Sequence, residues 1–245
     1  MYTTPLPTHT SLPDLAEEFS SFFQTKIQKL RDNLVNSKQS SQNFNVSIQP
    51  VRCPTSLLNF NPVTEQFLSD LLQKSPAKSC MLDPVPVHLL KEDLGLIVPS
   101  VTKIINASLS EGVFPSSLKK NIIFLSLKKG KPDHDEYNSY RPISNIAFLS
   151  KTLEWAASIQ TINYLLENDL LGKFQSAYRQ FHSTKTAMLC VTNKILREIN
   201  SGNEVVLLMF DLSAAFDTID HVLLLERLQH RYGIGGTVLK WYKSY

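Results

Sequence analysis

The stretch that decides the fold is LLMFDLSAAFDTIDH, residues 207–221, in which an apolar run ends at an acid and two more acids follow. Residues 204–210, EVVLLMF, have the β-branched and long aliphatic side chains of a buried strand. An acid at the end of such a strand, as Asp211 would be, lies where a sheet meets solvent or a binding site. We therefore expect Asp211 to follow a buried strand at the edge of a site.

Two interpretations of these acids are open on the residues alone. Aspartate is a common helix N-cap, so Asp211 could cap the turn while Asp217 or Asp220 caps the helix that follows. Alternatively, Asp211 is a magnesium ligand, because this hard cation prefers carboxylate oxygens and substrate phosphates. The spacing of the acids does not decide between the two.

Composition limits the class of protein. The chain has 245 residues, 42% of them hydrophobic, which is enough to bury a core, and its 25 Lys and Arg nearly balance 22 Asp and Glu. Any basic surface must therefore be local. The three cysteines are widely separated and odd in number, which fits neither a disulfide framework nor a zinc site and favours a reducing compartment. No apolar stretch approaches a membrane span and no secretory signal is present, so we expect a soluble intracellular protein.

The pattern of apolar residues divides the chain into an extension and a body. An amphipathic helix is predicted over 12–34, and a polar linker rich in Ser, Asn and Gln follows, with a boundary near 36–60. We therefore predict two parts, a helical extension with its linker over 1–60 and the body over 61–245. Within the body we expect a β-rich run at 121–132, a strand at 204–210, and helical segments at 63–75, 88–94, 97–112, 153–165, 186–202 and 221–233. A further element, of no assigned type, begins at 236.

The motif FDLSAAFDTIDH, residues 210–221, resembles the first catalytic motif of reverse transcriptases from LINE-type, non-long-terminal-repeat retrotransposons, especially Jockey-like elements. Two further stretches, YNSYRPISNIAFLSKTLEW at 137–155 and FQSAYRQFHSTKTAM at 174–188, are similar to family motifs in the same order. Upstream, SCMLDPVPVHLLK at 79–91 and EGVFPSSLKKNIIFLSLKK at 111–129 resemble the block before the fingers. The helix that contains Phe19 resembles the segment joining the family's endonuclease to its polymerase, so the resemblance covers nearly the whole chain.

The resemblance implies an α+β fold: the fingers and part of the palm of a right-hand polymerase, with an incomplete antiparallel palm sheet, packed helices and a helical extension in front. It implies an RNA-directed DNA polymerase that acts on an RNA template, a DNA primer and deoxynucleoside triphosphates, with two Mg²⁺ ions as cofactors. By the same analogy the protein would act in the nucleus. No membrane is implied, and a protein partner stays unknown.

The resemblance also assigns roles within the first motif. Asp211 matches the acid that binds the catalytic metal ions, which leaves Asp217 and Asp220 as structural residues. The backbone beneath the incoming triphosphate matches Leu212, Ser213, Ala214 and Ala215, where the alternative is simply a tight turn. Phe216 matches the aromatic residue under the deoxyribose, and its alternative is an ordinary core phenylalanine.

The other motifs supply candidate contacts to anions. Arg141 matches the fingers arginine that contacts triphosphate oxygens, a task suited to a planar fork of donors, although a surface salt bridge is the alternative. Lys129, with Lys128 and Lys131, would complete an electrostatic clamp with Arg141, and the alternative for these lysines is a solvated hairpin tip. Arg179 and His182 would face the template strand, while a helix cap at Ser183–Thr184 explains much of that motif without function.

The sequence departs from the family pattern in three places and in its extent. Ala177 stands where glycine is usual, Phe181 where glycine or a polar residue is common, and Leu125 where proline is frequent. The chain stops before the family's QG and YADD motifs, and the second of these holds the other catalytic carboxylates. We therefore expect a fragment that is inactive alone. The alternatives are a nucleic-acid-binding module without catalysis, or a product that does not fold productively because its sheet edge is uncovered.

Overall fold

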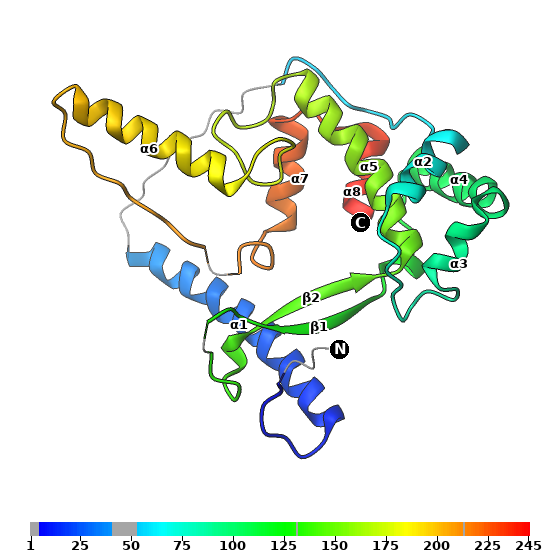
Figure 1. Cartoon of the computed structure of the whole chain (residues 1–245), viewed down its shortest axis with the longest axis horizontal. Helices are drawn as coiled ribbons and strands as arrows, with labels where there is room; N and C mark the ends of the chain where they lie inside the picture. Colours follow the sequence, from blue (N-terminus) through cyan, green and yellow to red (C-terminus); the bar gives the residue numbers. More distant parts are fainter. Residues whose placement is uncertain (1–4, 41–52, 131, 213) are drawn as a thin grey trace.

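The structure is a computed structural model that describes residues 5–40, 53–130, 132–212 and 214–245. Most of the helices gather on one side of the molecule, while α6 stands apart on the other (Figure 1). The helices are α1 (Leu12–Ser40), α2 (Glu65–Lys74), α3 (Val87–Glu92), α4 (Leu94–Glu111), α5 (Phe148–Glu167), α6 (Thr184–Asn200), α7 (His221–His230) and α8 (Gly236–Ser244), with short 3-10 turns η1 (Ser116–Lys119) and η2 (Tyr137–Ser139). The sequence predicted α1 to α7 as helices, whereas the element expected from residue 236 had no assigned type and is the helix α8.

The main core is built where α2, α4, α5 and α8 meet around Trp241. The indole Nε1 of Trp241 donates a hydrogen bond to Ser108 Oγ at 3.1 Å, so the polar end of this buried ring has a partner. The rings of Phe60 and Phe114 meet the indole edge-on, at 5.9 and 5.5 Å between centroids. The last helix, α8, is thereby packed into a core whose other residues come mainly from the first two thirds of the chain. We call this unit the packed body.

Part of the expected linker belongs to the packed body. Leu57 forms a parallel bridge with Ile234, in which Leu57 N–H donates to Gly233 O and Gly235 N–H donates to Leu57 O, both at 3.0 Å. Phe60 is buried in the core, and α1 continues to Ser40. The rest of the expected linker, residues 41–52, lies outside the described residues, so the division at residue 60 stays a prediction.

An antiparallel hairpin of β1 (Asn121–Leu127) and β2 (Tyr140–Ile146) forms the one sheet in the described part of the chain. Strand β1 was predicted, whereas β2 was not predicted as a strand, because Pro142 and the polar residues around it do not give a strand pattern. With this hairpin beside the helices the fold is α+β, as expected.

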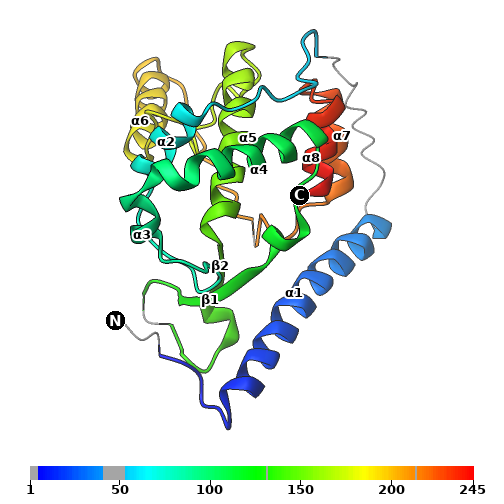
Figure 2. The ribbon, with the colours of Figure 1, turned by 90° about the vertical axis from the view of Figure 1, so that its right-hand side faces the viewer.

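Helix α1 packs along the hairpin as an amphipathic helix (Figures 1 and 2). Leu15 and Phe19 are buried against Tyr140 in a second, smaller core. The Phe19 ring lies 4.6 Å from the ring of Tyr137 and 5.1 Å from that of Tyr140. The N-terminal part of the predicted apolar face, from Leu15 to Phe23, is thus explained by its contact with the hairpin.

The predicted buried strand at 204–210 is wrong. Residues 203–212 have no regular secondary structure, and their side chains are exposed, with Phe210 at 90%. A strand needs a partner for its backbone N–H and C=O groups, and no described strand pairs with this segment. The apolar run therefore extends through solvent from the end of α6 toward α7 (Figure 1).

The exposed segment is the centre of a longer stretch that touches the main core near its two ends, through Tyr164, Leu228 and Tyr232. Between Thr161 and Ile234 no described residue is buried. This stretch, residues 162–233, contains all of α6 and α7 and is called the open region below.

Of the described helices, none is both long enough and apolar enough to cross a membrane.

Candidate nucleotide and nucleic-acid site

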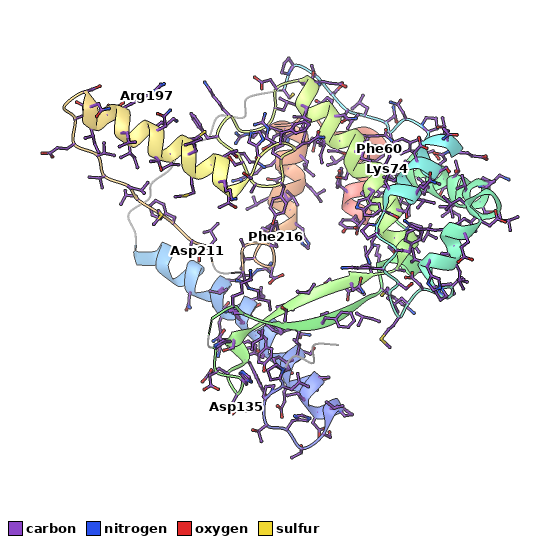
Figure 3. All side chains as sticks on the ribbon, in the orientation of Figure 1. Phe60, Lys74, Asp135, Arg197, Asp211 and Phe216 are labelled. Atoms are coloured by element: carbon purple, nitrogen blue, oxygen red, sulfur yellow. The ribbon has the colours of Figure 1, made fainter. Side chains whose placement is uncertain are left out.

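Asp211 follows the exposed segment and not a buried strand. Its side chain is exposed, and no described residue donates a hydrogen bond to it. The interpretation of Asp211 as a turn cap therefore has no support among the described residues, whereas its carboxylate is open to a ligand. Asp211 and Phe216, labelled in Figure 3, both lie on the connection between α6 and α7.

Asp220 is a helix cap, as one interpretation predicted. Its Oδ1 accepts the backbone N–H groups of Val222 at 2.9 Å and Leu223 at 3.0 Å, at the start of α7. The bond from Leu223 N–H is the main reason that the pKa of this carboxyl lies below its usual value, and the nearby charges of Arg31 and His221 act in the same direction. Asp217 is exposed and has no hydrogen bond from a described residue.

The described residues do not assemble a magnesium site. Across the described ranges, no three His, Cys, Asp or Glu side chains come close enough together to hold an ion. Asp211 offers one open carboxylate, while an oxygen of Asp220 is already engaged in capping α7. A pair of catalytic ions needs more carboxylates than this, so the metal-binding role of Asp211 stays a prediction.

The turn after Asp211 is tight, and its aromatic residue is exposed. Ala214 has a φ of 51°, in the left-handed region, and its carbonyl accepts Thr218 N–H at 3.1 Å. The alternative of a tight turn therefore describes Ala214 well. Leu212 and Ala215 are exposed, and Ser213 lies outside the described residues. Phe216 is not a core residue here, because its ring is exposed and meets the ring of Tyr178 edge-on at 6.0 Å.

Arg141 lies near the start of β2, opposite Ser126 on β1. Its guanidinium is exposed and has no hydrogen-bond partner among the described residues, so nothing described supports the salt-bridge alternative. Lys128 is half-buried and Lys129 is exposed, while Lys131 lies outside the described residues. No contact links Arg141 to Asp211 among the described interactions.

Acids balance the lysines of the hairpin tip. Asp133, Asp135 and Glu136 are exposed within the same connection between β1 and β2. Asp135 accepts both the backbone N–H of Thr8 at 2.8 Å and its hydroxyl at 3.1 Å, and these bonds lower the pKa of its carboxyl. The tip is therefore a weaker anion clamp than its lysines alone indicate.

The motif at 174–188 is a turn followed by a capped helix. Ser183 Oγ accepts Thr186 N–H at 3.2 Å, and Thr186 Oγ1 accepts Ser183 N–H at 2.9 Å, which completes a capping box at the start of α6. The capping interpretation is thus confirmed for Ser183, although its partner is Thr186 and not Thr184. His182 Nδ1 lies 2.8 Å from Gln180 O, and Arg179 is half-exposed.

Two aromatic residues in that turn have left-handed backbones. Phe181 has a φ of 62° and Tyr178 a φ of 58°. Side chains with a Cβ are disfavoured there, which explains physically why glycine is common at the position of Phe181 in the family pattern. Ala177, the other departure, is not among the residues with positive φ.

Sequence reasoning missed the exposed rings of this turn. Phe174 is exposed, and Lys194 Nζ lies 4.1 Å from its ring centroid. Aromatic residues are more often assigned to a core, which is why Phe174 and Tyr178 were not considered as binding residues. A signal was available, because residues 170–197 contain cations but no acid.

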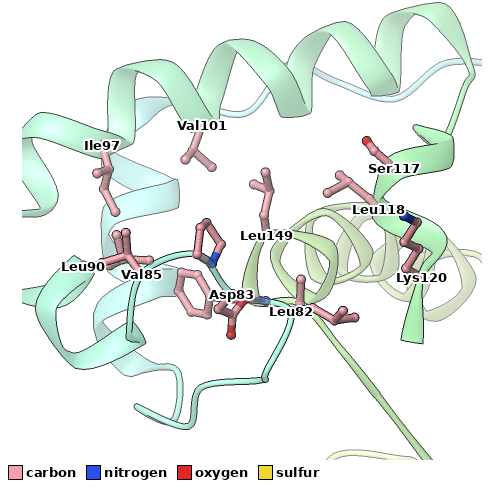
Figure 4. Close-up of a pocket in the computed structure, with 13 residues that line it drawn as sticks. Leu82, Asp83, Val85, Leu90, Ile97, Val101, Ser117, Leu118, Lys120 and Leu149 are labelled. Carbon is pink, nitrogen blue, oxygen red and sulfur yellow. Dashed lines mark hydrogen bonds between the residues drawn. The ribbon is translucent and has the colours of Figure 1, made fainter. Parts of the chain in front are cut away.

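A cavity of about 550 Å³ lies elsewhere, between α3, α4, η1 and the start of α5 (Figure 4). Leu90, Ile97 and Val101 line it, and Asp83 lies at its edge. Both oxygens of Asp83 are engaged, with Phe148 N–H at 2.7 Å and Cys80 N–H at 2.6 Å. Asp83 thus links the segment before α3 to the start of α5, and none of the predicted site residues lines the cavity.

Comparisons with known proteins agree with the motifs. No family model matches the chain. It is 26% identical over 215 residues to a Drosophila melanogaster protein named as the probable RNA-directed DNA polymerase from transposon BS, covering 88% of this chain and 22% of that protein. It is 25% identical over 210 residues to the corresponding protein of transposon X-element, covering 85% of this chain and again 22% of the relative.

The resemblance identified from the motifs is therefore confirmed: over most of its length the chain is similar to two proteins named as probable RNA-directed DNA polymerases of transposons. It spans about a fifth of the length of the curated relatives that it matches.

Proposed function

We propose that the chain forms the fingers and the first palm segment of an RNA-directed DNA polymerase from a non-long-terminal-repeat retrotransposon. The observation that carries the proposal is the match over most of the chain to two proteins named as such polymerases. The motif blocks that correspond to family motifs occur in the family's order. In the whole protein the partners would be an RNA template, a DNA primer and deoxynucleoside triphosphates, and the site of action would be the nucleus.

In this proposal Arg141 binds the triphosphate, since its guanidinium is exposed at the start of β2 and its planar fork of donors suits phosphate oxygens. Asp211 provides a carboxylate for magnesium, and Phe216 provides the ring beneath the deoxyribose. Their exposure supports these roles, because each side chain is accessible to a ligand. Lys128 and Lys129 are secondary contacts, because acids of the same tip offset their charge.

Across the described residues no three His, Cys, Asp or Glu side chains are grouped so that they could hold a metal ion, so we derive no catalytic step through magnesium. We propose that the 245-residue chain alone carries out no templated DNA synthesis. Primer extension on an RNA template should show no activity above that of an Asp211→Ala variant. Extension by the unmodified chain that this substitution abolishes would overturn this part of the proposal.

The catalytic role of Asp211 is tested in a longer protein. We suggest joining this chain to the segment that follows the matched region in the transposon BS polymerase and measuring primer extension with magnesium. Asp211→Asn should abolish extension, whereas the matched Asp217→Asn should only weaken it, because only the first change removes charge from the metal site. Equal tolerance of both changes in an active protein would show that the acid is wrongly assigned.

A second function is favoured by a different observation. Residues 170–197 carry five cations and no acid, a charge pattern typical of nucleic-acid contact. The chain could thus bind nucleic acid without catalysis. This alternative predicts binding of RNA by the chain that is insensitive to Asp211→Ala.

A further inference from the structure

The cavity between α3, α4, η1 and the start of α5 has no part in the proposed function (Figure 4). Its volume of about 550 Å³ lies within the range of small-molecule pockets, about 300–1,000 Å³. Aliphatic side chains form most of its wall, and those that are only half-buried are Leu82, Leu90, Ile97, Val101, Leu118 and Leu149. A ligand with an apolar body would cover this surface and gain the free energy of removing it from water.

Hydrogen bonds hold the walls of the cavity together. Asp83 accepts Phe148 N–H at 2.7 Å and Cys80 N–H at 2.6 Å, which joins the segment before α3 to the start of α5. Ser150 Oγ donates to Leu118 O at 2.8 Å, which joins η1 to the same helix. The walls are therefore positioned by contacts within the chain, and a ligand would not need to order them on binding.

The two ends of the cavity differ in polarity. Figure 4 shows Leu90 and Ile97 at one end and Ser117 and Lys120 at the other. Ser117 and Lys120 are exposed, and neither side chain has a hydrogen-bond partner among the described residues. One end thus offers an ammonium group and a hydroxyl group to a ligand, whereas the other offers aliphatic carbon.

The charge at the polar end favours an anion. Among the described residues that line the cavity, Asp83 is the one acid, and both of its carboxylate oxygens already accept backbone N–H groups. These two donors offset part of the charge of Asp83, whereas no described hydrogen bond engages the ammonium of Lys120. A carboxylate at this end would accept a charge-assisted hydrogen bond from Lys120, and a cation would be repelled by it.

We infer that the cavity binds a small carboxylic acid with an apolar chain, its carboxylate beside Lys120 and Ser117 and its chain between α4 and α5. Small-molecule sites combine mostly apolar walls with a few polar groups that fix the orientation of the ligand, and this cavity has both. A neutral apolar molecule would leave the donors at the polar end unused, and a nucleic acid would leave the aliphatic wall uncovered. The inference is independent of the proposed function, because none of the residues assigned there lines the cavity.

Binding in the cavity is tested with decanoate, added to the full chain and followed by titration calorimetry and by the methyl NMR signals of Ile97 and Leu149. Binding should saturate, and both methyl signals should shift. Val101→Phe enlarges a side chain of the cavity wall and should abolish binding. The matched control is Val206→Phe, which enlarges an exposed side chain outside the cavity and should leave binding unchanged. Binding that persists in folded Val101→Phe would place decanoate elsewhere and overturn the inference.

The anion end is tested by comparing decanoate with decanol, which has the same chain and no charge. Lys120→Gln should weaken decanoate binding about twofold to fivefold and leave decanol binding unchanged, because only the carboxylate interacts with the ammonium charge. The matched control is Lys119→Gln, which removes the same charge from an exposed neighbour that does not line the cavity, and it should change neither affinity. Equal weakening of decanoate by the two lysine changes, or of both ligands by Lys120→Gln, would overturn the inference.

Other occupants of the cavity are outcomes of the same experiments. Circular dichroism shows whether Val101→Phe is folded, and Lys120→Gln decides the matter if it is not, because an exposed side chain can be changed without loss of the core. Dimerisation of the unmodified chain that Val101→Phe abolishes would assign the cavity to a second copy and overturn the inference. Absence of saturable decanoate binding by the folded full chain would also overturn it.

Discussion

The packed body and the open region differ in how their side chains are held. In the packed body Leu68, Leu153, Ile234 and Trp241 are buried, and the core includes residues from α2, α4, α5 and α8. In the open region, residues 162–233, no described residue is buried, although it contains Asp211, Phe216, Arg179 and His182. The difference teaches that stability resides in one region while most of the residues with proposed chemistry reside in the other.

The largest expected effect is on the free energy of unfolding when one aromatic side chain is removed from each region. Trp241→Ala should lower the free energy of unfolding by about 3–5 kcal/mol, because it empties a buried site and leaves Ser108 without its donor. Phe210→Ala should change it by less than about 0.5 kcal/mol, because the ring is already in solvent. Denaturant unfolding of both variants measures this difference in stability. Similar losses of unfolding free energy in the two variants would contradict the distinction between the packed body and the open region.

Glycines sharpen the comparison at a smaller scale. Gly236 in the packed body and Gly202 in the open region both have positive φ, but a Cβ on Gly236 would lie 2.4 Å from Leu58 O, whereas one on Gly202 would meet nothing within 4 Å. Gly236→Ala should therefore cost about 3 kcal/mol or more, and Gly202→Ala only the backbone strain of about 1 kcal/mol. Thermal unfolding tests this order, and a greater loss at Gly202 would contradict it.

A helix cap in the open region should have a local effect only. Ser183→Ala removes the capping box of α6 and should destabilise that helix by about 1 kcal/mol. Unfolding of the packed body should not change, because no residue of α6 is buried. Hydrogen exchange of α6 amides measures the local effect, with the exposed mid-helix change Thr192→Ala as control; a shift in global unfolding would show that α6 is coupled to the core.

The smallest effect is the dependence of the α7 cap on pH. The pKa of Asp220 is below its usual value because the charged form accepts the N–H groups of Leu223 and Val222. The cap is therefore fully stabilising above the unfolded-state pKa of about 4, and this is lost as pH falls through the lower folded-state value. NMR shifts of the two amides should follow this titration, which Asp220→Asn should remove. A midpoint at or above 4 would contradict it.

Sequence patterns predicted elements that depend on local signals. The helices follow apolar periodicity, and the caps at Ser183 and Asp220 follow side-chain chemistry that acts within three residues. The strand prediction at 204–210 failed because an apolar run does not reveal whether a partner strand exists. Strand β2 was missed because Pro142 obscured its pattern.

The candidate site was predictable to a lesser extent. The roles of Asp211 and Arg141 come from the resemblance, and their exposure is compatible with those roles without testing them. The rings of Phe174 and Tyr178 were missed because exposure of a large aromatic side chain is not encoded in any local pattern. The absence of acids over 170–197, by contrast, is visible in the sequence, and Phe174 and Tyr178 lie within this range.

Hydrogen–deuterium exchange of the full chain, read by mass spectrometry, tests the separation of the two regions most directly. Peptides from α4, α5 and α8 should exchange slowly, because these helices surround the buried Trp241. Peptides covering 204–212 should exchange at the rate of an unprotected chain, because their amides have no partner strand among the described residues. Slow exchange at 204–212, comparable to that of the packed body, would mean that this segment is a buried strand and would contradict the account.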